Sequence, residues 1–223
     1  MADSKKKKKS TGKNYGVADI NRWTFPKLDL PQNWQDHLGN LPERFTMLIE
    51  GASGHGKTEY NGQLIKLFAI DLNRRVHMNC PEILKAPDWK EMWDRQGLDK
   101  IPPGNFTYAH EGLQDFETWF EYIRRSKARY IFLDSLDSIN LTYDQFTRLK
   151  NTFKNRSFIM NCWNDPMNAE SKKIKYWCQI KTQVKNFQAI PRSRFGGNKP
   201  HLIYREGYER MTGKKAPTQG SLF

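Results

Sequence analysis

The sequence contains few cysteines and no long apolar run. Its three cysteines, Cys80, Cys162 and Cys178, have no paired or metal-binding spacing, so we expect reduced thiols in or near the core of a cytosolic protein. No apolar stretch approaches the roughly 18 residues of a membrane-spanning helix. The N-terminal lysines are not followed by the apolar segment of a secretory leader. These absences predict a cytoplasmic protein with no membrane partner.

Basic residues are abundant and unevenly distributed. The 223-residue chain has 37 Lys and Arg against 24 Asp and Glu, a formal net charge of +13. Most of the excess lies in residues 1–14, with six lysines and one aspartate, and in residues 171–215, with twelve basic residues and two glutamates. Such uneven charge indicates a polyanionic partner. For 171–215 we favour nucleic acid over a solvated surface. For 1–14, a low-complexity segment predicted to be disordered, the two interpretations are balanced.

The most specific motif is a phosphate loop. It reads Gly51-Ala52-Ser53-Gly54-His55-Gly56-Lys57-Thr58 and fits G-x-x-x-x-G-K-[ST] at every fixed position. An apolar run precedes it and a helix-like stretch follows, which is the strand–loop–helix context of a nucleoside triphosphate site. The glycines let backbone N–H groups cradle phosphate oxygens. All eight residues are therefore candidate ATP contacts.

Individual side chains of this loop have separate predicted roles. We expect the Lys57 ammonium on the β- and γ-phosphates and the Thr58 hydroxyl on Mg²⁺. His55 fills a free position of the pattern. We expect it to face solvent, with a phosphate contact as the alternative.

Apolar runs and helical periodicities alternate along the chain. We expect strands at 44–50, 75–80, 105–109, 130–133 and 157–162, and helices at 57–72, 87–93, 113–126 and 142–154. This alternation predicts an α/β fold with a mostly parallel sheet flanked by helices. Three short strands in 180–205 would add a C-terminal antiparallel extension. The predicted organisation is a basic tail at 1–14, a lead-in packed on the domain at 15–43, a nucleotide-binding domain at 44–208 and a flexible tail at 209–223.

Polar residues follow three of the expected strands. Asp134 ends the run at 130–133, where a carboxylate holds magnesium in nucleotide-binding α/β sheets; a helix-capping or turn acid is the alternative. Glu82 lies just past the second strand and is the candidate group for activating water, with a surface acid as the alternative. At the end of 157–162, Asn161 or Asn164 could sense the γ-phosphate, although for Asn164 a turn role is equally supported.

The order of these motifs resembles the RecA/RadA-type ATPase core over about residues 40–206. The match is specific at 51–58 and 130–135, and looser at Glu82 and at Ser193-Arg194-Phe195-Gly196. The resemblance implies a RecA-like P-loop NTPase fold, ATP and Mg²⁺ as cofactors, self-assembly and a single-stranded DNA partner. By size it is closest to the small RecA-core proteins of phages, which include single-strand annealing proteins, and this implies a bacterial or phage-infected cell.

The resemblance also implies roles for particular residues. Lys57, Asp134 and Glu82 would be catalytic, with Glu82 activating water. Arg194, and with less support Arg192, would reach the nucleotide of a neighbouring subunit. Ser193 stands where a lysine-bearing pattern is common, and no separate DNA-binding domain is evident. Both departures weaken the case for strand exchange.

The predicted loop at 163–176 is the candidate DNA contact, because the resemblance places that loop toward the filament axis. Lys172, Lys173 and Lys175 would attract phosphates, and Trp177 would stack on unpaired bases. Core packing is an equal alternative for Trp177.

The last five residues resemble the bacterial sliding-clamp-binding motif. They read Gln219-Gly220-Ser221-Leu222-Phe223, and the resemblance implies that Gln219, Leu222 and Phe223 enter pockets of a clamp. A segment that packs on its own domain is the alternative.

Three functions fit this sequence. The leading hypothesis is an ATP-dependent, ATP-hydrolysing protein of DNA recombination, annealing or replication that binds single-stranded DNA, which would stimulate turnover. The second is an ATP-gated adaptor or loader that recruits partners to the sliding clamp or replication fork with little turnover. The third, a small-molecule kinase, is disfavoured by the basic ends and by the lack of an Arg-rich lid.

Overall fold

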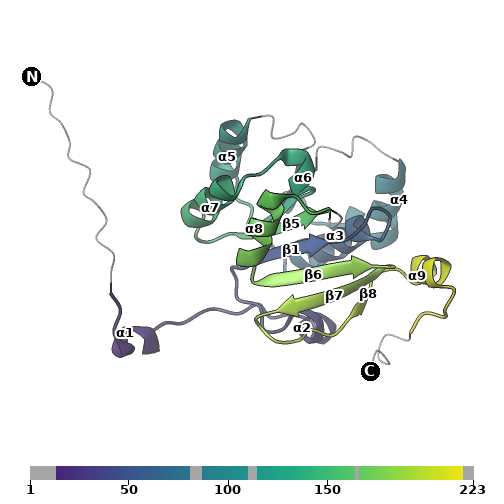
Figure 1. Cartoon of the computed structure of the whole chain (residues 1–223), viewed down its shortest axis with the longest axis horizontal. Helices are drawn as coiled ribbons and strands as arrows, with labels where there is room; N and C mark the ends of the chain where they lie inside the picture. The colour runs from purple at the N-terminus through teal and green to yellow at the C-terminus, as the bar shows by residue number, and fades with distance from the viewer. Residues whose placement is uncertain (1–13, 81–86, 110–114, 164–165, 218–223) are drawn as a thin grey trace, which may run out of the picture.

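A single eight-stranded sheet organises the chain. The computed structural model describes residues 14–80, 87–109, 115–163 and 166–217 (Figure 1). The strands lie in the order β3-β2-β4-β5-β1-β6-β7-β8. They comprise β1 Thr46–Glu50, β2 Val76–Asn79, β3 Phe106–Ala109, β4 Tyr130–Leu133, β5 Ser157–Cys162, β6 Ile180–Lys185, β7 Gln188–Ser193 and β8 His201–Leu202. Strands β1 to β6 pair in parallel, whereas β7 and β8 are antiparallel. The predicted parallel sheet with a C-terminal antiparallel extension is confirmed.

Helices cover both faces of the sheet. They comprise α1 Val17–Asn21, α2 Gln32–Leu38, α3 Lys57–Lys66, α4 Pro87–Gln96, α5 Phe116–Arg125, α6 Leu136–Ile139, α7 Tyr143–Thr152, α8 Ala169–Trp177 and α9 Arg205–Thr212. A π-helical turn, η1 Leu67–Asp71, continues α3, and a short 3₁₀-helix, η2 Leu98–Lys100, follows α4. Buried residues of α2, α3 and α4 share one core cluster, and those of α5, α6, α7 and α8 share the other.

The two cores arise from the alternation of strand side chains. On β5, Ile159 joins the core under α3, whereas Phe158 and Met160 join the core under α5 to α8. Successive strand residues point to opposite faces, so a strand covered on both sides must be apolar throughout. This explains why the continuous apolar runs in the sequence predict the central strands correctly.

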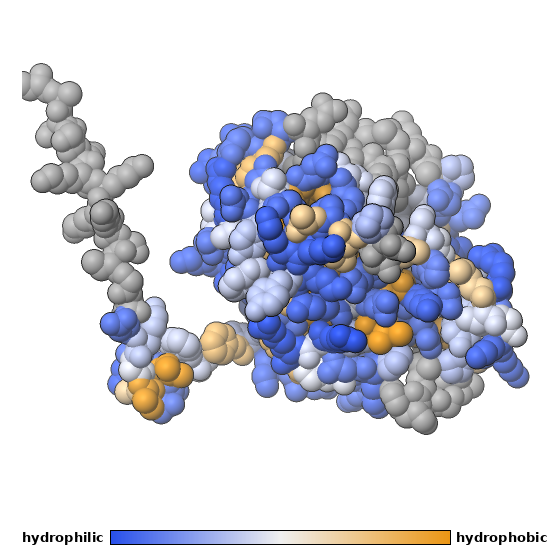
Figure 2. Space-filling view, viewed as in Figure 1, coloured by the Kyte–Doolittle hydropathy of each residue, from blue (hydrophilic) through white to orange (hydrophobic). Residues whose placement is uncertain are grey.

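The lead-in divides into two parts. Trp34, Leu38 and Leu41 are buried in the core under α3. Residues 15–25, the N-terminal arm, instead lie away from the body (Figure 1) and expose apolar side chains, including Val17 at 75% and Phe25 at 69% (Figure 2). The prediction that the whole of 15–43 packs on the domain was therefore wrong for the arm.

Two further expectations need correction. The segment expected as a loop at 163–176 is mostly helix, because α8 occupies Ala169–Trp177 and Asn168 caps it by accepting a hydrogen bond from the Ser171 amide at 2.7 Å. The tail expected to begin at 209 begins later, since α9 continues to Thr212. Beyond it, the Ala216 amide donates to Glu209 at 2.9 Å.

The described residues agree with the expected cysteine chemistry. All three cysteines are buried and unbridged. Burial raises the pKa of Cys178 to about 12, as expected for an inert core thiol. None of the described helices has the length and apolar character needed to cross a membrane.

Candidate nucleotide-binding site

The phosphate loop has a backbone that only glycine permits at three positions. Gly54 and Gly56 have φ angles of 76° and 102°, in the left-handed region where other residues are strained. A Cβ atom at Gly51 would lie 2.3 Å from the Val184 carbonyl oxygen, and one at Gly56 would lie 2.7 Å from the Phe187 ring. The loop is therefore held against β6 and the β6–β7 turn.

The loop leads directly into α3. Gly56 is the N-cap and Lys57 the first helical residue, so the free N–H groups and the positive dipole end of a ten-residue helix face the loop. The Lys57 ammonium donates to the carbonyl oxygens of Gly51 and Ala52 at 2.7 and 2.9 Å. It is thereby positioned over the loop that would receive phosphate.

A carboxylate from β4 meets α3 next to the loop. Asp134 directly follows β4 and is 8% exposed. Its Oδ2 accepts a hydrogen bond from Asn61 Nδ2 at 3.3 Å. Because Thr58 and Asn61 are three residues apart on α3, they lie on the same helix face. The structure therefore brings Asp134 to the face of α3 that carries Thr58, as magnesium coordination through both groups requires.

Asn61 was missed in the sequence. Its position three residues after the motif places it on the same helix face as Thr58. That placement indicates a site residue only together with Asp134, which is 73 residues away in the sequence.

Asn161 adds a buried amide on the same side of the sheet. It follows Ile159, which faces α3, by two residues and is 1% exposed, so its side chain also lies on the α3 side. Neither amide atom of Asn161 has a hydrogen-bond partner in the described residues, and the same is true of Asn61 Oδ1. Buried polar groups without partners are uncommon and costly. They fit a site completed by polar ligand atoms.

His55 contradicts the expectation of a solvent-facing residue. Its Nδ1 accepts a hydrogen bond from the Asn186 amide, and its carbonyl oxygen accepts one from the Phe187 amide, both at 3.0 Å. Asn186 and Phe187 form the β6–β7 turn, with φ angles of 51° and 56°. His55 thus joins the phosphate loop to this turn. A contact that spans 131 residues leaves no signal in the local sequence.

The other candidate residues are in separate places. Glu82 and Asn164 lie outside the described residues, as do Gln219, Leu222 and Phe223 of the clamp-binding-like motif. Ser135 caps α6, where its hydroxyl accepts from the Ser138 amide at 3.3 Å. Glu82 therefore stays a prediction for water activation.

Arg194 lies away from the phosphate loop of its own chain. It follows β7, whose last residue, Ser193, pairs with Ile180, the first residue of β6. Since β6 is parallel to β1, Arg194 is at the edge where the parallel strands begin, and the loop is at the edge where they end. The predicted contact with a nucleotide requires a neighbouring copy, as the resemblance implies.

The described residues match the donor set expected for Mg²⁺ and a triphosphate. Backbone amides, the Lys57 ammonium and a helix N-terminus suit phosphate oxygens. A hydroxyl and a carboxylate suit a hard cation that keeps several waters. Among the described residues no group of three or more His, Cys, Asp or Glu side chains lies together as a metal site.

The predicted DNA contacts lie on α8 and differ in availability. Lys172 and Lys173 are exposed, although Lys173 pairs with Glu170 at 2.6 Å. Lys175 is two-thirds buried and forms an ion pair with Glu50 at the end of β1, so it is better suited to positioning α8. Trp177 is 49% exposed, which disagrees with the alternative of full core packing.

A basic strip on β6 and β7 continues this surface. The buried residues Ile180 and Val184 face the core under α3, so Lys181, Lys185 and Arg192 point to the other side, where α8 lies. That side is largely hydrophilic in Figure 2. The sequence contains a partial signal for these lysines. Polar residues at 181, 183 and 185 alternate with Ile180 and Val184, and Thr182 interrupts the apolar set.

Comparisons with known proteins concern the fold. No protein-family model and no curated protein matches the chain. A KaiC-like protein from the hyperthermophilic archaeon Pyrococcus horikoshii OT3 is similar in structure, with a TM-score of 0.57 and 18% identity over 76% of this chain and 89% of that chain. The flagellar accessory protein FlaH from Methanocaldococcus jannaschii has a TM-score of 0.54 and 13% identity, over 83% of this chain and 90% of its own. At these identities the likeness establishes the fold, which is that of the RecA-like P-loop ATPases.

Proposed function

We propose that this chain is a Mg²⁺-dependent ATPase that binds single-stranded DNA and acts in recombination, annealing or replication. The observation that carries the proposal is the Asn61–Asp134 contact. It joins the phosphate-loop helix to the carboxylate that ends β4, so the groups needed for a triphosphate and its cation share one site.

Each residue contributes according to its chemistry. Mg²⁺ bound with ATP would neutralise part of the phosphate charge and polarise the γ-phosphoryl group. The amides of 51–58 would donate to phosphate oxygens. The Lys57 ammonium would give up its hydrogen bonds to the Gly51 and Ala52 carbonyl oxygens and donate to phosphate oxygens instead. Thr58 and Asp134 would hold the cation. Glu82 would accept a proton from the attacking water.

The surface formed by α8, β6 and β7 supports the DNA part of the proposal. Trp163 is 51% exposed and Tyr176 is 72% exposed. Tyr176 lies on α8 next to Lys175, and Trp163 directly follows β5. Exposed aromatic rings offer stacking faces to unpaired bases, and lysines attract the backbone phosphates. An aromatic and basic surface of this kind suits a single strand better than a duplex.

The exposed N-terminal arm favours assembly. Apolar side chains such as Val17 and Phe25 lie uncovered on a segment away from the body, which is unfavourable in water. We include a homo-oligomer in the proposal, with Arg194 completing a neighbour's site. An exposed apolar segment can also bind a different protein. The arm therefore also supports the second candidate, an ATP-gated adaptor with little turnover. A sliding clamp, recognised through 219–223, is a proposed partner.

The test is ATP hydrolysis with and without single-stranded oligothymidine. The original chain is compared with Lys57→Ala, with the pair Lys172→Ala and Lys173→Ala, and with a control pair, Lys66→Ala and Lys100→Ala. The control lysines are exposed and lie outside the proposed sites. We expect hydrolysis that DNA stimulates several-fold. Lys57→Ala should abolish nucleotide binding in calorimetry, and the α8 pair should lose the stimulation. The control pair should behave as the original chain does.

The outcomes separate the candidates. Binding of Mg²⁺–ATP with negligible turnover, with or without DNA, would favour the adaptor. A folded protein that takes up no nucleotide would overturn both candidates.

A further inference from the structure

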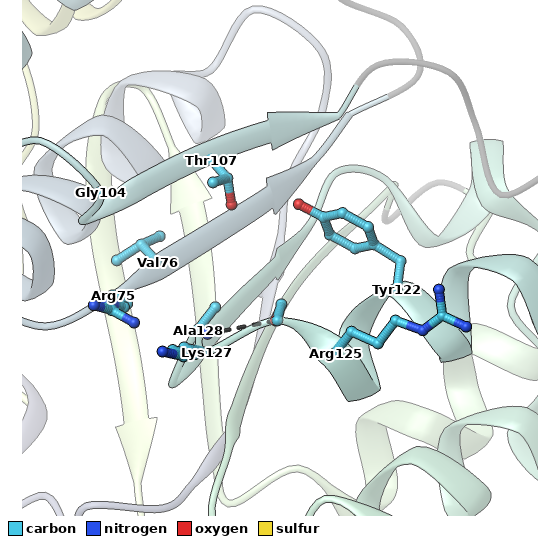
Figure 3. A pocket seen from close by; sticks show the side chains of 9 residues that line it. Arg75, Val76, Gly104, Thr107, Tyr122, Arg125, Lys127 and Ala128 are labelled. Atoms are coloured by element: carbon cyan, nitrogen blue, oxygen red, sulfur yellow. Dashed lines mark hydrogen bonds between the residues drawn. The ribbon is translucent and has the colours of Figure 1, made fainter.

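A pocket lies at the opposite edge of the sheet from the phosphate loop. Its volume is about 310 Å³, at the lower end of the range for small-molecule sites. Arg75, which precedes β2, and Lys127, which precedes β4, lie at its mouth (Figure 3). The phosphate loop follows the other end of the parallel sheet. A four-residue strand spans about 13 Å, so the two sites are separate.

The pocket is surrounded by cations that lack acidic partners. Arg75, Arg125 and Lys127 line it and are exposed, and none of them forms an ion pair within the described part of the chain. Two glutamates on neighbouring segments already form ion pairs with other arginines. Glu43 pairs with Arg74 and Arg129, and Glu121 of α5 pairs with Arg124. The local potential is therefore positive, which favours an anion.

A buried guanidinium strengthens this potential. Arg156 is 9% exposed and donates to the carbonyl oxygens of Ile123 and Ser126 at the end of α5. Burial and the nearby Arg129 lower the pKa of Arg156. Because Arg156 already occupies these helix-end carbonyls, the other cations are not needed to satisfy them. Lys127 directly follows the Ser126 C-cap of α5, where a cation also favours the helix dipole. Arg75 precedes β2 and is not part of α5, so the α5 dipole does not account for its place in the pocket lining.

Hydroxyl groups and an aromatic ring complete the wall. Thr107 and Tyr122 line the pocket, and their hydroxyls face the same space (Figure 3). Behind them, the fully buried His77 shares a hydrogen bond with Thr107 through Nδ1 at 2.9 Å, and its ring lies 4.8 Å from that of Tyr122. Its Nε2 has no partner in the described residues. His77 does not itself line the pocket, and it supports the Thr107 side chain from behind.

We propose that this pocket binds a phosphate-bearing ligand. Arg75 and Lys127 would make charge-assisted hydrogen bonds to the phosphate. The Tyr122 hydroxyl would add a neutral donor, and the Tyr122 ring would contact a flat group attached to the phosphate. Two sources share this chemistry: a free mononucleotide and a phosphate of a single strand. The proposal does not depend on the function assigned to the phosphate loop.

The test places binding on the structure by NMR. It uses the full chain with Lys57→Ala, which weakens phosphate binding at the loop, and titrates inorganic phosphate, thymidine monophosphate and an eight-nucleotide oligothymidine. We expect saturable shifts of the Val76, Thr107 and Tyr122 amides. Adding Arg75→Ala and Lys127→Ala should weaken this binding at least tenfold. Adding the matched pair Lys66→Ala and Lys100→Ala, which removes the same charge elsewhere, should change it less than twofold.

The probes distinguish the two sources. If phosphate and the mononucleotide shift these amides and the oligonucleotide does not displace them, the ligand is a free mononucleotide. If the oligonucleotide shifts the amides at a lower concentration than the mononucleotide does, the ligand is a single strand. Both results support the pocket. If no probe shifts these amides, or if the pocket pair and the control pair bind with equal affinity, the proposal is wrong.

Discussion

At the scale of single residues, Asn161 shows how a buried polar side chain can indicate function. In a sheet that helices cover on both faces, a strand position is most stable with an apolar side chain. Asn161 instead has two amide atoms without a hydrogen-bond partner in the part of the chain that the structure describes. Leaving such groups unpaired costs about 1–3 kcal/mol. The residue therefore weakens the free protein, and a bound ligand is the physical reason we assign to it.

This interpretation predicts opposite effects on stability and binding. Asn161→Leu has a similar volume and removes the unpaired amide, so the free protein should be unchanged or stabilised by up to about 1–2 kcal/mol in urea unfolding. Its affinity for Mg²⁺–ATP should fall about tenfold in calorimetry. Met160→Leu, which faces the other core, is the control and should leave affinity unchanged. A destabilised Asn161 variant with full affinity would show that the amide is merely structural.

At the scale of elements, the phosphate loop and the β6–β7 turn form one unit. His55 accepts from the Asn186 amide, and the Phe187 ring lies against Gly56.

His55→Ala should release the turn, so the Asn186 and Phe187 amides should exchange faster with solvent. Affinity for ATP should weaken about three- to tenfold, because the loop must be ordered on binding. His55→Asn keeps an acceptor near the Nδ1 position and is the matched control. Equal exchange rates in the alanine variant and the original chain would refute the coupling.

Elements could be predicted where burial alone determines the sequence. The strand at 130–133 is a continuous apolar run because both faces are covered, and the loop at 51–58 is determined by local backbone geometry. Helix α8 was missed because only Ser171 and Ile174 are buried along it, which leaves no apolar periodicity. Its Asn168 cap was the available signal. The Asn61–Asp134 contact could not be predicted, because it depends on how distant segments meet.

At the scale of the whole molecule, the buried His37 and His77 and the partly buried His201 join elements that are far apart in sequence. His37 of α2 contacts the Tyr60 hydroxyl of α3 at 2.7 Å, and His201 of β8 contacts Gln63 of α3 at 2.8 Å. Burial lowers the pKa of His37 to about 3 and the pKa values of His77 and His201 to about 4. These side chains are therefore neutral in the folded protein at pH values where the unfolded chain already binds their protons.

The sign of the resulting pH dependence follows from proton uptake. Below the unfolded pKa of about 6.5, the unfolded state binds more protons, so the free energy of unfolding rises with pH. The contribution is complete above that value and is lost as pH falls toward 3–4.

From pH 7.5 to pH 5.5, the free energy of unfolding measured in urea should fall by about 1.4 kcal/mol per buried histidine. His37→Gln should reduce this loss by about one histidine's share. Leu38→Ala, which creates a cavity and removes no titrating group, should lower stability equally at both pH values. If His37→Gln keeps the full pH dependence, then the contact between α2 and α3 is not the proton-sensitive element that its burial implies.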